Sequence, residues 1–233
     1  RIYSNTGFDA LADHLALRAG MPATRYVAAA VFEPLALAAT DLRDRSLAHG
    51  AWSTAHDLAR VAVELLRPTV VHPDTLAEAT RVQYPGLAGV LPGFGRQDPN
   101  DWGLGFELRS HKAPHWTGTT NSPGTFGHFG GSGTFCWVDP SLDHALVVLT
   151  DEPFDSWAAE AWPALSDAVV AALSARGASA ARVERGAPVP ERAELLAGFD
   201  VVVDLSATAG DRAVDARTVF ADLQPALLGS TRR

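Results

Sequence analysis

The segment from 125 to 151 most restricts how this chain can fold, because a glycine-rich stretch there leads into two apolar stretches joined by an Asp-Pro turn. Residues 144–149 form an almost unbroken apolar run, which is typical of a strand buried on both faces. Residues 134–138 predict its antiparallel neighbour across the turn at 139–143. Four of the seven residues from 127 to 133 are glycine, and glycine inside a strand marks a bulge or a close approach to the backbone. The segment therefore predicts an antiparallel sheet with a ligand-binding edge.

Helical patterns come before this sheet. Apolar residues at helical spacing predict a helix over 7–19, which Gly20 ends. A second helix is expected over 23–32. A third is expected to start at the caps Ser53 and Thr54 and to end before Pro68.

The remaining elements complete the predicted order. They are a short helix over 74–81, a loop rich in Gly and Pro over 85–101, a strand over 102–109, and a helix from about 155 to 175. Helices, then antiparallel strands, then a helix indicate an α+β fold, an antiparallel β-sheet with flanking helices.

The last 58 residues differ in composition from the rest. Residues 176–190 are rich in Ala, Gly, Arg and Pro, which predicts a linker. A strand over 199–205 and a helix over 213–223 follow, but one such unit cannot bury its own faces. We therefore expect a main domain over 1–175 and a linker with a weakly ordered extension over 176–233.

Four short segments, in this order, resemble landmarks of the class C β-lactamase-like serine hydrolases, which include penicillin-binding proteins, D-aminopeptidases and family VIII esterases. Tyr3-Ser4-Asn5 resembles the Tyr-x-Asn motif, and His128-Phe129-Gly130-Gly131 resembles the third motif, which varies between Lys-Thr-Gly and His-x-Gly. Residues 52–59 and 102–106 resemble two structural landmarks of the family. The resemblance covers about residues 1–175, and four ordered matches are far more specific than any one of them.

The resemblance implies a role for each matched residue. Tyr3 is expected to move a proton to or from the leaving group, and His128 to engage the substrate and assist that transfer. Asn5 is expected to orient the acyl group of the substrate. Gly130 and Gly131 are expected to let the acyl group lie against the strand, with the Gly131 N–H in the oxyanion hole. Taken alone, the first motif is typical of a turn before a helix and a strand histidine is typically structural.

The family's nucleophile is missing from the sequence. That nucleophile is the serine of a Ser-x-x-Lys motif. The only lysine is Lys112, and Arg109 stands three residues before it. We therefore expect a C-terminal portion of a longer hydrolase, incomplete at its N-terminus and inactive alone. The alternative is a noncatalytic pseudoenzyme that binds or regulates. Ser132 lies in a Gly-Gly-Ser-Gly stretch but is followed by a strand, not by the helix that a nucleophile elbow requires.

Composition limits the partners. The formal net charge of −8, with no cluster of Lys or Arg, argues against nucleic acid. No apolar stretch is long enough to span a bilayer. His111 and His115 are four residues apart, but Pro114 prevents the helix that would align them, so no metal and no cofactor is expected. The expected partner is a small amide or ester substrate, whereas compartment and oligomeric state stay open. Eighteen arginines against one lysine indicate a GC-rich bacterial genome.

Overall fold

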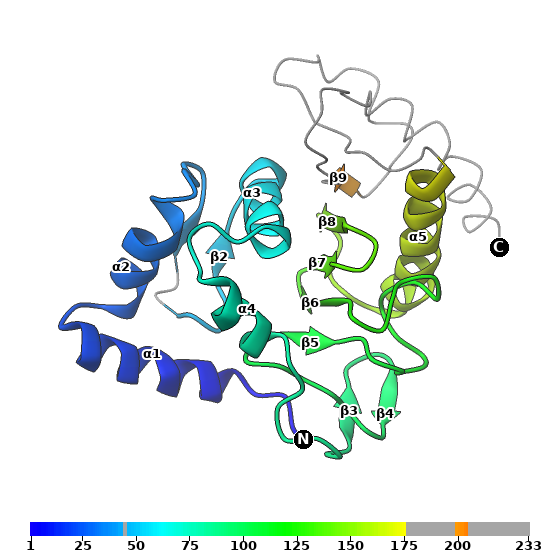
Figure 1. Cartoon of the computed structure of the whole chain (residues 1–233), viewed down its shortest axis with the longest axis horizontal. Coiled ribbons are helices and arrows are strands. Elements are labelled where there is room, and N and C mark those ends of the chain that lie inside the picture. Colours follow the sequence, from blue (N-terminus) through cyan, green and yellow to red (C-terminus); the bar gives the residue numbers. More distant parts are fainter. Residues whose placement is uncertain (44–45, 176–198, 205–233) are drawn as a thin grey trace, which may run out of the picture.

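A five-stranded antiparallel sheet organises the fold, and its strands follow one another in chain order. The computed structural model describes residues 1–43, 46–175 and 199–204 (Figure 1). The strands are β5 (Glu107–Leu108), β6 (Phe126–Gly130), β7 (Thr134–Asp139), β8 (His144–Thr150) and β9 (Phe199–Asp204). The predicted α+β class, with an antiparallel sheet and flanking helices, is confirmed.

The predicted hairpin of β7 and β8 is present and fixed by a buried carboxylate. Asp139 pairs with His144 at the turn, and the first five residues of β8 are buried, as the apolar run indicated. The Asp139 carboxylate accepts hydrogen bonds from the backbone and hydroxyl of Ser122 and from the Thr125 hydroxyl. These bonds tie the segment before β6 to the turn, so the glycine-rich strand enters the sheet in a fixed position.

The predicted helices form close to their expected bounds. They are α1 (Asn5–Ala19), α2 (Ala23–Val27) continuing into the π-helical turn η1 (Ala28–Phe32), α3 (Ala55–Leu66), α4 (Pro73–Ala79) and α5 (Ser156–Ala175). Gly20 caps α1 at a φ of 65°, a left-handed conformation that favours glycine. Thr54 caps α3 by accepting from the backbone N–H of Asp57, which confirms the predicted cap.

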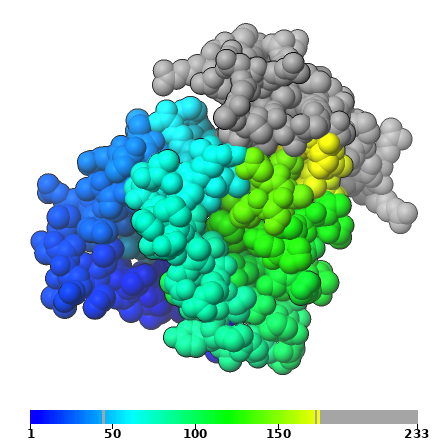
Figure 2. Space-filling view, viewed as in Figure 1, coloured from blue at the N-terminus to red at the C-terminus, as the bar shows by residue number. Residues whose placement is uncertain are grey.

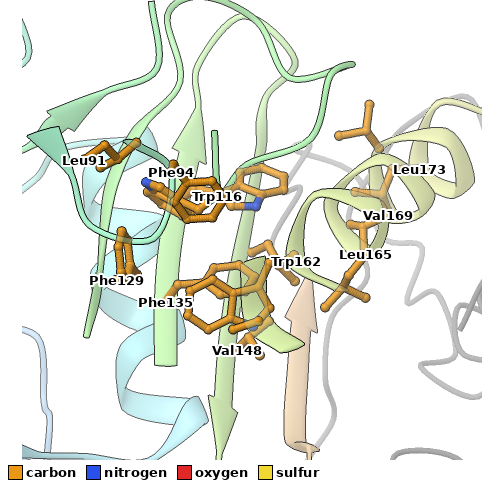
Figure 3. Close-up of a cluster of buried hydrophobic side chains, with 14 residues drawn as sticks. Leu91, Phe94, Trp116, Phe129, Phe135, Val148, Trp162, Leu165, Val169 and Leu173 are labelled. Atoms are coloured by element: carbon orange, nitrogen blue, oxygen red, sulfur yellow. The ribbon is translucent and has the colours of Figure 1, made fainter. Parts of the chain in front are cut away.

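Two apolar clusters hold helices against opposite faces of the sheet, with α5 on one face and α3 on the other (Figure 1). On the α5 face, Trp162 meets Phe129 and Phe135 (Figure 3). On the α3 face, Phe126 and Val138 pack with the alanines of α3. Phe129 therefore anchors the third-motif strand to α5, while its neighbour His128 faces the opposite side.

The segment predicted as a loop over 85–101 contains a hairpin, so that prediction was wrong. Strand β3 (Gly89–Leu91) pairs with β4 (Gly95–Gln97). Leu91 and Phe94 are buried in the α5-side cluster, and this burial outweighs the loop-like composition. A second short pair joins β1 (Asp41–Leu42) to β2 (Ala51–Trp52).

The strand predicted over 102–109 is also shorter than expected. Only Glu107 and Leu108 form β5, and Trp102 contributes a single bridge to Glu107. Gly105, between them, has a φ of 85°, which turns the chain back instead of extending it.

The apolar stripe of α1 is only partly covered by the residues that the structure describes. Its pattern predicts one buried face, yet Phe8, Ala12, Leu15 and Ala16 are half-buried and Leu11 is 55% exposed. Figure 2 shows this segment, in blue, at one margin of the molecule.

Part of the C-terminal extension belongs to the sheet, because β9 pairs with β8 over residues 199–204. The predicted linker and the predicted helix over 213–223 lie outside the described residues, as does the expectation of weak order there. None of the described helices has the length and apolar character needed to cross a membrane.

Candidate functional site

Tyr3 is held in place by contacts on both sides of it. The side chain of Ser4 caps α1 by accepting from the backbone of Thr6, and Ser4 itself is extended. On the other side, the Arg1 guanidinium donates to the Gln83 carbonyl at 2.6 Å, and the Arg1 backbone nitrogen donates to the Ala88 carbonyl. The first residues therefore lie against the segment that leads to β3, and Tyr3 is positioned between this anchor and the helix cap.

The structure brings Tyr3 and His128 together, although 125 residues separate them in sequence. The Tyr3 hydroxyl lies 3.4 Å from His128 Nε2, and the ring centroids are 5.6 Å apart. Trp102 completes the group, with its ring 6.2 Å from Tyr3 and 5.6 Å from His128. Three of the four segments that resemble the hydrolase family therefore meet at one place.

The edge of β6 is open where the third motif lies. Strand β5 pairs with β6 only at Phe126 and Gly127, so no other described strand covers that edge from His128 to Gly130. A Cβ at Gly127 would lie 2.1 Å from the Cys136 carbonyl oxygen, which explains glycine there. A Cβ at Gly131 would meet nothing within 4 Å. The strand thus offers space for a ligand at the end where Gly130 and Gly131 lie.

Asn5 is less closely tied to this group. It is the first residue of α1 and is exposed, and no hydrogen bond joins its side chain to Tyr3 or His128. Ser4, not Asn5, is the N-cap of α1. The predicted contact of Asn5 with the acyl group of a substrate stays a prediction.

The imidazole of His128 has a perturbed acid–base equilibrium. Burial lowers the pKa of His128 below its ordinary value of 6.5, and the nearby Glu107 carboxylate opposes this only in part. Its Nδ1 is buried without a hydrogen-bond partner among the described residues. The neutral ring at pH 7 can therefore accept or donate a proton toward Tyr3 through Nε2.

A histidine titration followed by NMR tests this electrostatic picture. We expect His128 to protonate only below pH 6.5, because its charged form loses solvation in the folded chain. Since the unfolded chain binds this proton at higher pH, His128 stabilises the fold above pH 6.5, and this contribution is lost as the pH falls. A His128→Gln variant should lose that pH dependence, whereas a measured pKa at or above 6.5 would contradict the burial argument.

Two residues near the motif carry groups that act as nucleophiles in other enzymes, and neither is placed for it. The Ser132 hydroxyl shares a hydrogen bond with the Thr134 hydroxyl at 3.1 Å, not with His128. Cys136 pairs directly with His128 across the strands, but burial raises the pKa of its thiol to about 12. The described residues thus bring Tyr3 and His128 together, but neither the Ser132 hydroxyl nor the Cys136 thiol forms a hydrogen bond with either of them.

A buried ionic network beside this group was missed by the sequence reasoning. Glu107 accepts from Lys112 at 2.7 Å, from His115 at 3.0 Å and from the Trp116 indole at 2.6 Å. Burial raises the pKa of Glu107, but the hydrogen bonds and charges of His115 and Lys112 outweigh it and hold the pKa below its ordinary range. No signal in the sequence marked this network, because lysine and glutamate side chains are normally exposed.

His115 therefore does not pair with His111, the residue four positions away that its spacing suggested. It faces Glu107 and Thr117, with no described contact to His111. No group of three or more His, Cys, Asp or Glu side chains among residues 1–43, 46–175 and 199–204 is arranged to hold a metal ion.

Comparison with known proteins finds both a family model and solved structures that are similar to this chain. The family model described as Beta-lactamase matches residues 1–171. The crystal structure of a beta-lactamase from Mycobacterium bovis is similar, with a TM-score of 0.70 and 56% sequence identity over 72% of this chain and 63% of that chain. The chain therefore spans less than two thirds of that structure's length. No match was found among the curated proteins.

Proposed function

This chain belongs to the beta-lactamase family, and we propose that it forms the C-terminal part of a serine hydrolase that acts on an amide or ester through an acyl-enzyme. The fold and family are those of such hydrolases. In this proposal the chain supplies Tyr3 and His128 for proton transfer, and Asn5, Gly130 and Gly131 for substrate binding.

The observation that carries the proposal is the 3.4 Å approach of the Tyr3 hydroxyl to His128 Nε2. General acid–base catalysis requires donor and acceptor within hydrogen-bond reach, and loose contacts are common before substrate binds. Burial lowers the pKa of His128, so its ring is neutral at pH 7. When the Tyr3 phenol gives its proton to the leaving group, the Nε2–H tautomer of His128 can donate a hydrogen bond that stabilises the phenolate left behind. The open β6 edge next to His128 is where an acyl group would lie.

The nucleophile is proposed to come from a Ser-x-x-Lys segment outside these 233 residues. No such motif is present in this sequence; the Ser132 hydroxyl bonds to Thr134, and the Cys136 thiol, although it lies across the strands from His128, has its pKa raised to about 12 by burial. The incomplete burial of the apolar stripe of α1 supports a longer protein, because an amphipathic helix normally packs its apolar face against other elements. Without that segment the chain is expected to be inactive.

The substrate is proposed to be a neutral ester or peptide in preference to an anionic β-lactam. Phe129 occupies the position where Lys-Thr-Gly motifs carry a hydroxyl, and its ring packs against Phe94 and Trp162 in the core. Because the pKa of His128 is also lowered, the strand presents neither a hydroxyl nor a fixed positive charge for a carboxylate at these two positions.

Burst kinetics on the longer gene product, compared with this chain, test the proposal. We expect p-nitrophenyl butyrate to give a burst of p-nitrophenol equal to the enzyme concentration, followed by slower turnover. The value of kcat/KM should be higher for this ester than for a chromogenic cephalosporin. The 233-residue chain should give no burst.

The alternative is a noncatalytic binding protein of the same fold. It would also explain why the sequence has no Ser-x-x-Lys motif. It would bind an ester analogue without any burst in the longer protein. A burst from the 233-residue chain itself would contradict both accounts.

A further inference from the structure

A buried ion pair lies directly beside the aromatic group of the proposed site. The side chains of Lys112 and Glu107 are 1% and 0% exposed, and their charged atoms are 2.7 Å apart. The Lys112 ammonium also donates to the carbonyl of Asp101 at 2.9 Å. It lies over the indole of Trp102, 5.9 Å from the ring centroid. Lys112 therefore contacts both the residue before Trp102 and the Trp102 ring.

Trp102 connects this ion pair to the proposed catalytic residues. Its ring meets His128 edge-on, with the ring planes at 68°, and also contacts Tyr3. Its backbone is held by the Gln83 N–H and by the bridge to Glu107. The indole is half-buried, and its ring contacts are with Tyr3, His128 and the Lys112 ammonium.

Stability alone is a poor explanation for the pair. Burying two charges costs desolvation that their attraction roughly offsets, and apolar residues of the same volume often serve as well. A cation over an indole, by contrast, favours one orientation of the ring. The Glu107 carboxylate in turn holds the Lys112 ammonium. Glu107 is itself held by the hydrogen bonds that it accepts from His115 and Trp116.

We propose that Lys112, held by Glu107, is a positioning residue that orients the Trp102 indole so that Tyr3 and His128 keep their mutual geometry. Its effect on catalysis rests on the proposed function, whereas its effect on the orientation of Trp102 does not. Lys112 touches neither the substrate nor the reacting atoms in this account.

The chemical shifts of the His128 ring protons report the orientation of the Trp102 indole directly, because the ring current of a neighbouring indole changes those shifts. In Lys112→Met, we expect these shifts to move toward random-coil values. We expect kcat of the longer protein to fall about 10- to 100-fold with little change in KM.

Because Lys112→Met leaves a buried carboxylate unpaired and can unfold the chain, the decisive variant is Glu107→Gln with Lys112→Met, which removes both charges. Arg96→Met, which removes the exposed pair with Asp98, is the matched control and should change neither readout.

The double variant separates positioning from stability. If Lys112 positions Trp102, the double variant folds but keeps the altered His128 shifts and the lowered kcat. Wild-type shifts and wild-type kcat in the double variant would overturn the proposal, as would altered shifts with unchanged kcat. If the wild-type longer protein hydrolyses neither substrate, the proposed function fails and the shifts alone decide whether Lys112 positions Trp102.

Discussion

Replacing Trp162 by alanine should lower the free energy of unfolding by about 3–5 kcal/mol, the usual cost of removing a large buried aromatic side chain. Trp162 is fully buried, and its ring meets Phe129 at 5.7 Å and Phe135 at 4.9 Å. It joins α5 to Phe129 on the strand that carries the third motif, so its loss should also loosen His128. Urea unfolding followed by circular dichroism measures the change, provided that the slope with denaturant stays constant.

Leu17→Ala is the matched control for this prediction. Leu17 is also apolar and helical but is 80% exposed, so its truncation should change the free energy of unfolding by no more than about 0.5 kcal/mol. If the two variants unfold at the same urea concentration, the cluster between α5 and the sheet is not the core of the fold.

Replacing His128 by glutamine in the longer protein is expected to reduce kcat by about 10²- to 10⁴-fold, the usual contribution of a general acid–base group. The imidazole is the group closest to the Tyr3 hydroxyl in the proposed proton path. Tyr3→Phe should have a loss of similar size, and the double variant should lose little more, because residues that act as a unit are not additive. Steady-state hydrolysis of p-nitrophenyl butyrate measures all three.

His56→Gln is the control for the histidine substitution, because His56 is exposed on α3. Its kcat should equal that of the wild type. A His128→Gln protein that keeps kcat within a factor of about ten would show that the imidazole has no part in proton transfer. Additive losses from Tyr3→Phe and His128→Gln would show that the two residues act separately.

Elements defined by local pattern could be predicted from the sequence. The apolar run of β8 and the cap Thr54 of α3 depend on neighbours within a few residues, and both are confirmed. The hairpin of β3 and β4 could not be predicted, because its stability comes from burying Leu91 and Phe94 in a cluster with residues such as Phe129 and Phe154, which follow much later in the chain.

In the candidate site, too, some features could be predicted from the sequence and others depended on tertiary packing. Motif order indicated that Tyr3 and His128 belong to one site, and the structure places them together. The Glu107–Lys112 pair escaped notice because burial of a charge is a tertiary property, and a lysine alone in a sequence is normally exposed. The incomplete burial of the α1 stripe could not be predicted either, since a periodic pattern predicts an apolar face but not what covers it.

Fluorophosphonate labelling followed by peptide mass spectrometry tests the central claim most directly. The reagent forms a covalent bond with an activated serine, so it reports the nucleophile independently of the substrate. We predict no label on the 233-residue chain, and one label on the longer gene product at the serine of a Ser-x-x-Lys motif before Tyr3. Stoichiometric labelling of a serine within these 233 residues, Ser132 included, would contradict the account.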